Sequence, residues 1–142
     1  MYTTGGLWRV REVLCHFVST EAALAKYGGD ILAGGPGAPD NLVIDEFNET
    51  QVGGMADRET GGLIAEFEQR RAATLEMVRG MSDADFDRVG RHPWFGKTAL
   101  EPMLKLVYRH TMIHIRDVRK ALDTGRPAPH IDVRPPAETQ QA

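Results

Sequence analysis

Residues 108–117 read YRHTMIHIRD, and this stretch places two histidines four positions apart within an apolar pattern. The surrounding segment, 98–124, repeats apolar side chains at spacings of three and four, which is typical of an amphipathic helix. On a helical wheel at about 100° per residue, His110 and His114 both face the apolar side. Because residues four apart on a helix are neighbours, we expect the two imidazoles to lie together.

The two ends of this predicted helix carry recognisable signals. Thr98 and Glu101 have the spacing of a capping box. Pro102 offers a competing start, since proline is favoured in the first turn of a helix. Gly125, followed by Pro127, predicts the end of the helix.

Three further segments have a helical period, and they span residues 7–27, 41–57 and 60–80. We expect Gly28 and Gly29 to end the first segment and Asp40 to cap the second. No segment alternates as a half-buried strand should, and residues 81–97 are predicted to be a loop with a short helical turn at 83–87. Four helices with short to medium connections predict an all-α fold, a four-helix bundle.

Length and composition limit the classes of function. The chain has 142 residues, the size of one ordinary domain. We expect the bundle to occupy residues 1–125, and residues 126–142 to form a proline-rich, poorly ordered tail. The net charge of −3 gives no basic surface for nucleic acid or for an anionic membrane. No stretch approaches the roughly 18 apolar residues of a membrane span, so we expect neither partner.

Two features of the N-terminal part predict a cytoplasmic location. Cys15 is the one cysteine of the sequence and cannot form an internal disulfide, which fits a reducing compartment. The first residues also lack the charged start and apolar run of a signal peptide.

The first predicted helix also carries a histidine that faces inward. His16 lies on the shoulder of an apolar stripe that includes Val13 and Phe17, and Cys15 is turned away from it. Glu21 falls on the opposite shoulder of the same stripe. Three of the five histidines are therefore directed into the bundle, from two different helices.

Three inward imidazoles pose a chemical problem, because buried ring nitrogens need partners and burial opposes charging all three rings. A metal ion solves it by binding one nitrogen of each neutral ring. An isolated inward histidine is more often a core residue than a ligand, and the pair His110 and His114 alone is a weak signal. His16 on a second helix strengthens the metal interpretation. Three protein ligands would leave one coordination position open, which is typical of a catalytic site.

Three stretches of the chain resemble the DinB-like superfamily of four-helix-bundle metalloproteins, including the YfiT-type hydrolases and the N-terminal domain of mycothiol-dependent maleylpyruvate isomerase. They are LWRVREVLCHFVSTE at residues 7–21, DEFNE at 45–49 and YRHTMIHIRDVRKAL at 108–122. The resemblance implies that His16, His110 and His114 bind one divalent metal ion. Zinc and nickel are the preferred ions, and iron is also compatible with imidazole ligands.

The resemblance also implies an enzyme with a small-molecule substrate, either a thiol-dependent S-transferase or a hydrolase, which forms a homodimer. The co-substrate of the transferase would be a low-molecular-weight thiol such as mycothiol or bacillithiol. Asn48 matches an asparagine of the family and is a catalytic candidate; alternatively, it makes a hydrogen bond between helices. Glu21 is the second candidate, which could orient a histidine or carry a proton, or could be a carboxylate that reaches past the stripe to solvent.

The competing hypothesis is a non-catalytic helical bundle, a dimer or interaction protein whose histidines are structural or bind metal adventitiously. Around the site, Asp117 is expected at the surface, paired with a nearby Arg or Lys. His92 and Trp94 could cover the pocket or form a dimer contact. Alternatively, they are a solvated loop histidine and a packed indole, which is the interpretation we prefer. Arg70 and Arg71 could meet an anionic substrate or could extend past the apolar face to solvent.

Overall fold

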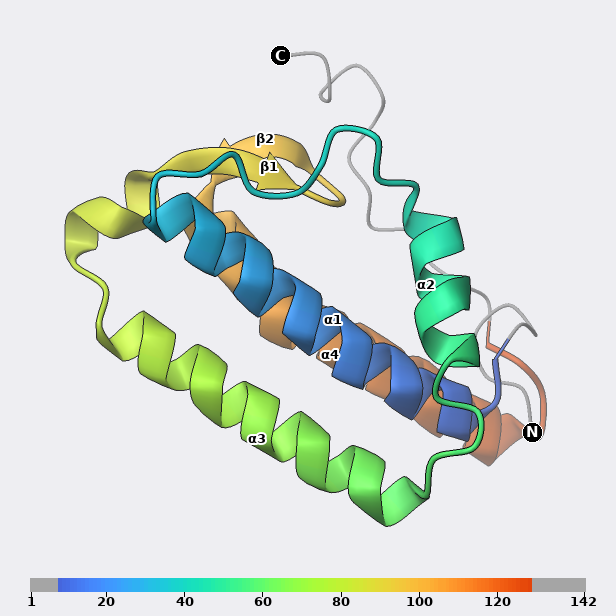
Figure 1. Ribbon diagram of the computed structural model, residues 1–142. Helices are drawn as coiled ribbons and strands as arrows, with labels where there is room; N and C mark the ends of the chain where they lie inside the picture. Colours follow the sequence, from blue (N-terminus) through green and yellow to red (C-terminus); the bar gives the residue numbers. More distant parts are fainter. Residues whose placement is uncertain (1–7, 129–142) are drawn as a thin grey trace.

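The computed structural model describes residues 8–128, so the predicted tail lies outside the described residues beyond that point (Figure 1). Within this range the chain forms four α-helices, one short 3-10 helix and one antiparallel hairpin. The elements are α1 (Val10–Leu32), α2 (Ile44–Gly53), α3 (Thr60–Arg79), η1 (Asp83–Asp87), β1 (Val89–His92), β2 (Gly96–Ala99) and α4 (Leu100–Thr124). The predicted all-α bundle and the helical turn at 83–87 are confirmed.

Helix α1 is the central element of the fold. It packs against α2, α3 and α4, and it runs antiparallel to α4 (Figure 1). One apolar cluster lies mainly between α1 and α4, and a second joins α1 to α2 and α3. The first contains Leu24, Ile31, Leu100, Met103 and Val107, and the second contains Cys15, Val18, Val52 and Leu63. None of the helices within residues 8–128 is long and apolar enough to cross a membrane.

Helix α1 continues beyond the two glycines that were expected to end it. Gly28 and Gly29 each cost a helix about 1 kcal/mol relative to alanine. Extending the helix places Ile31 in the core, where 2% of its surface is exposed. Burial of such a side chain contributes about 1.5–3 kcal/mol, which offsets much of the glycine cost.

The hairpin of β1 and β2 corrects the expectation that the chain contains no strand. Val89 pairs with Ala99 and His92 with Gly96. Strands of four residues are too short to show a reliable alternation in the sequence. The hairpin lies directly on the end of α1, since a Cβ atom at Gly90 would be 2.2 Å from Cγ1 of Ile31.

Helix α2 begins later than expected, with Val43 rather than Asp40 at its N-cap. The preceding loop is held in an extended pairing with β1. Ala38 N–H donates to the carbonyl of Arg91 at 2.8 Å, and Arg91 N–H donates to the carbonyl of Pro36 at 2.8 Å. Local sequence patterns cannot predict this pairing, because the paired residues are more than 50 positions apart in the chain.

The start of α4 also differs from the capping-box prediction. Its N-cap is Ala99, which makes no side-chain cap, while Thr98 belongs to β2. Leu100 N–H instead donates to the carbonyl of Arg88 at 2.9 Å. Pro102 lies in the first turn, as its alternative interpretation required, and Gly125 ends the helix in the left-handed conformation (φ 66°).

Candidate metal centre

Three buried histidines meet where α1 and α4 lie side by side. His16 comes from the N-terminal third of α1, and His110 and His114 come from successive turns of α4. Their exposed fractions are 3%, 4% and 5%. The antiparallel packing of the two helices therefore brings together the three residues that the helical wheels selected.

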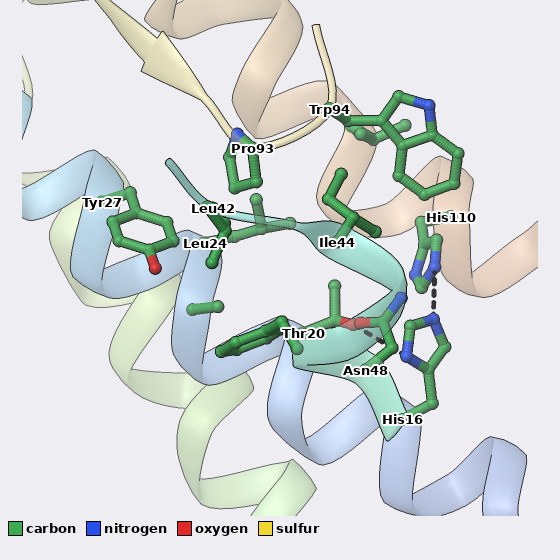
Figure 2. A pocket seen from close by; sticks show the side chains of 13 residues that line it. His16, Thr20, Leu24, Tyr27, Leu42, Ile44, Asn48, Pro93, Trp94 and His110 are labelled. Carbon is green, nitrogen blue, oxygen red and sulfur yellow. Dashed lines mark hydrogen bonds between the residues drawn. The ribbon is translucent and has the colours of Figure 1, made fainter. Parts of the chain in front are cut away.

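The imidazoles converge through the same ring atom. Nε2 of His110 lies 2.9 Å from Nε2 of His16 and 3.2 Å from Nε2 of His114. One ligand atom from each residue lies within 4.8 Å of the others, so the group could hold a single metal ion. Figure 2 shows His16 and His110 directed toward each other from their two helices.

Hydrogen bonding among the rings does not account fully for this geometry. In a neutral imidazole each nitrogen carries either one hydrogen or one lone pair. Nε2 of His110 can therefore make one hydrogen bond, yet two imidazole nitrogens lie within hydrogen-bond distance of it. A cation removes the conflict, because it accepts a lone pair from each of the three neutral rings.

Two of the three nitrogen–nitrogen separations also fit a shared cation. Nitrogen atoms that bind one ion at about 2.0–2.1 Å, at angles between a right angle and a tetrahedral one, lie about 2.8–3.4 Å apart. The separations of 2.9 and 3.2 Å about His110 fall within this range, and one ligand atom from each of the three residues lies within 4.8 Å of the others. The three histidines could therefore hold one divalent metal ion.

Neighbouring side chains hold the rings in place. Thr20 Oγ1 lies 3.4 Å from Nδ1 of His16, one turn further along α1. The indole of Trp8 contacts the His16 ring at a centroid distance of 4.7 Å, and the Phe17 ring lies 5.9 Å from that of His114. These packed aromatic rings limit rotation of the imidazoles.

A pocket opens beside His16 and His110 (Figure 2). It is bounded by α1, α2, α4 and the tip of the hairpin. Its lining includes the predicted catalytic candidate Asn48, which lies at the histidine end of the pocket. Ile44 and Phe47 of α2 also line the pocket, and no signal in the sequence indicated that they would face it.

Glu21, the other catalytic candidate, is held on a different side of α1. Its carboxylate accepts hydrogen bonds from Nε and NH2 of Arg71 at 2.7 and 3.1 Å. Its side chain is 3% exposed, so it does not extend to solvent, and it does not line the pocket beside His16. This geometry favours a structural role in joining α1 to α3.

The two arginines of α3 are also directed away from the pocket. Arg71 is bound to Glu21 and stacks over the ring of Phe67, with its guanidinium carbon 5.2 Å from the ring centroid. Arg70 pairs with Glu66 at the surface, at 2.6 Å. Neither lines the pocket that contains His16.

Asp117 is buried, which corrects its expected surface position. It is 2% exposed, and its Oδ1 accepts hydrogen bonds from its neighbour Arg116. Its Oδ2 has no hydrogen-bond partner within residues 8–128. The pairing with an arginine agrees with the expectation. The predicted exposure was wrong, because it was inferred from the position of Asp117 at the edge of the inner sector of the helical wheel.

The hairpin brings two loop residues into the neighbourhood of the site. His92 is 2% exposed rather than solvated, and its Nδ1 accepts hydrogen bonds from the N–H groups of Trp94 and Phe95 at 2.9 and 3.0 Å. Burial lowers the pKa of His92 to about 4, so the ring is neutral. Trp94 lines the pocket, and its ring lies 6.1 Å from that of His110. This position is the one expected if Trp94 covers the pocket.

A comparison with protein families identifies the family of the chain. A model described as the DinB superfamily matches residues 2–118, a range that includes all three histidines. Searches of curated proteins and of solved structures give no match. The family match confirms the resemblance that the short motifs had suggested.

Proposed function

Because the chain belongs to the DinB superfamily, we propose that it is a metal-dependent enzyme acting on a small molecule, either as a thiol-dependent S-transferase or as a hydrolase. The observation that carries the proposal is the convergence of Nε2 atoms from His16, His110 and His114. Three imidazoles favour zinc or nickel, with iron also acceptable, and they leave a position free for a reactant.

Each group around the site has a defined task in this proposal. A divalent ion, when bound, lowers the pKa of a thiol or a water molecule and so supplies a nucleophile at neutral pH. With Nε2 of His16 bound to the ion, Nδ1–H of the same ring would donate a hydrogen bond to Thr20 Oγ1 and so fix the ring. The Asn48 amide donates to an oxygen of the substrate, and Trp94 shields the reacting groups from solvent.

We also propose a homodimer that forms through the outer face of α4. Four large apolar side chains on this helix remain exposed by 38–62%; they are Tyr108, Met112, Ile115 and Leu122. Their spacings of four, three and seven place them along one side of the helix. Burial of such a stripe against a second copy would remove it from water.

Cobalt-substituted protein tests the open position directly. Addition of 2-mercaptoethanol is expected to produce a charge-transfer band in the near ultraviolet, and addition of ethanol is not. The His110→Ala variant serves as the control, because it should neither bind cobalt nor give the band. If the wild-type protein binds cobalt but shows no band, the thiol-dependent half of the proposal fails.

Product analysis separates transfer from hydrolysis. Metal-loaded protein is incubated with p-nitrophenyl butyrate, with and without the thiol, and the products are identified by mass spectrometry. A thioester formed only with enzyme and thiol supports transfer, whereas butyrate formed equally without thiol supports hydrolysis. If neither forms, the result supports the alternative that the protein is a non-catalytic bundle.

A further inference from the structure

The pocket beside the histidines extends along one face of α1. His16, Thr20, Leu24 and Tyr27 line it at spacings of four, four and three residues. His16 and Tyr27 are eleven positions apart on the helix, which corresponds to a rise of about 16 Å. Figure 2 shows Tyr27 at one end of the pocket and the two imidazoles at the other. The pocket is therefore elongated and has one chemically reactive end.

The remaining walls of the pocket are apolar. Helix α2 contributes Ile44 and Phe47, and the hairpin tip contributes Pro93 and Trp94. Among residues 8–128, none that lines the pocket carries a charged side chain. Asn48 provides an amide at the histidine end, which marks this end as the place for a polar group.

This apolar lining disfavours the binding of a charged group of a substrate. A carboxylate or phosphate that enters an apolar pocket loses its hydration, and no cationic side chain here replaces it. Arg71, the nearest candidate from the sequence, is bound to Glu21 and lines a separate groove on the α3 side. An aliphatic chain gains from the same walls, by about fourfold in affinity for each buried methylene.

We propose that the pocket binds a short, slender aliphatic tail of an uncharged substrate, whose reacting group lies at His16, His110 and Asn48. The cavity volume of ≈ 50 Å³ is about a third of that of a cavity that holds benzene, so the pocket admits a tail of about two carbons and no ring. This inference rests on the proposed function, because the metal site places the reacting group at the histidine end. It adds the substrate class, which neither the three histidines nor the family specifies.

A series of alkyl hydroxamates tests the inference by binding rather than by turnover. Acetohydroxamate, propionohydroxamate and butyrohydroxamate share one metal-binding group and differ in tail length. Isothermal titration of the zinc-loaded protein is expected to show a two- to fourfold gain in affinity per methylene. The monohydroxamate of butanedioic acid, whose tail ends in a carboxylate, is expected to lose most of that gain.

A pair of variants on α1 locates the tail. Ala23 lines the pocket, so Ala23→Leu should remove the gain in affinity that the longer tails give. Ala22→Leu adds the same side chain at a position outside the pocket lining and should keep the gain. Tails that add no affinity in the wild-type protein, or an equal affinity for the carboxylate-ended tail, would overturn the inference.

A metal-free arm separates this inference from the proposed function. If zinc or acetohydroxamate fails to bind, the metal-dependent function fails. The tail site is then tested with 1-butanol and butyrate on the metal-free protein, using the fluorescence of Trp94 in a Trp8→Phe background. A response to butanol that exceeds the response to butyrate, and that Ala23→Leu removes, supports an apolar tail site. Equal responses, or none, overturn it.

Discussion

His92 connects a single protonation state to the shape of the pocket. Its Nδ1 accepts hydrogen bonds from the N–H groups of Trp94 and Phe95, so the proton of the neutral ring is on Nε2. Protonation of Nδ1 would break both hydrogen bonds and charge a buried ring. Since Trp94 lines the pocket, the neutral state of His92 maintains one wall of the site.

The depressed pKa of His92 predicts a loss of stability in acid. The unfolded chain binds a proton at this position below about pH 6.5, whereas the folded protein does so only near pH 4, because burial disfavours the charged ring. The loss of stability caused by His92 is therefore absent well above pH 6.5. It grows as the pH falls from 6.5 toward 4, and it levels off below pH 4. Urea unfolding of metal-free protein should show a loss of about 2 kcal/mol from this group between pH 7 and pH 5.

A matched variant isolates the effect of His92 from that of the other histidines. His92→Asn keeps an acceptor oxygen close to the position of Nδ1 but does not titrate. Its unfolding free energy should fall less between pH 7 and pH 5 than that of the wild-type protein. An identical pH dependence in both proteins would contradict a buried, neutral His92.

At the scale of single residues, the sequence predicts the orientation of a side chain when that orientation depends on a single helix. His16, His110 and His114 could be selected because inward orientation follows from position on a helical wheel. The burial of His92 could not, because it arises from the pairing of β1 with β2 and from the contact of the hairpin with α1. Asp117 was misplaced for a related reason, since the wheel cannot tell how far the neighbouring helix covers its edge.

At the scale of elements, the pair of Glu21 and Arg71 joins α1 to α3. The carboxylate is 3% exposed and the arginine side chain 28%, so solvent screens the pair only partly. Removal of one partner leaves the other charge near the core without an opposite charge beside it, and this lowers the unfolding free energy. The pair therefore fixes the position of α3 against the helix that carries His16.

A double-mutant cycle measures this connection. Glu21→Gln and Arg71→Met should each lower the unfolding free energy by about 2 kcal/mol, and the double variant should lose less than their sum. The exposed pair of Glu76 and Arg79 on α3 provides the control, where the same cycle should give coupling within experimental error. Additive effects at Glu21 and Arg71 would show that the two charges do not stabilise each other.

The predicted elements succeed where local pattern dominates and fail where distant contacts decide. The bounds of α3 and the end of α4 at Gly125 follow from periodicity and from a glycine in the left-handed conformation. The continuation of α1 past Gly28 depends instead on the burial of Ile31 against α4 and the hairpin. The late start of α2 depends on the pairing of its preceding loop with β1.

At the scale of the whole molecule, α3 and α4 leave an open groove between them. Both helices pack mainly on α1, and the groove has a volume of ≈ 540 Å³. Leu75 from α3 and Tyr108 from α4 line it, each exposed by 45%. The apolar stripe on α4 that we assign to the homodimer begins beside this groove.

Disruption of the stripe should shift the protein toward the monomer. The Met112→Glu and Ile115→Lys variants place charges where a second copy would bury apolar surface. Light scattering after size-exclusion chromatography should show a dimer for the wild-type protein and a monomer for both variants. Val43→Glu changes an equally exposed apolar residue at the start of α2 and should leave the dimer intact. A monomeric wild-type protein would contradict the proposed interface.

The most direct test of the account is the metal content of protein purified without a histidine tag. After incubation with zinc and removal of the excess, mass spectrometry should find about one ion per wild-type chain. The same measurement should find almost none in His16→Ala or His114→Ala variants that keep the helical circular dichroism spectrum, while His92→Asn retains the ion. A wild-type protein that binds no ion, or variants that keep it, would contradict a metal centre formed by these three histidines.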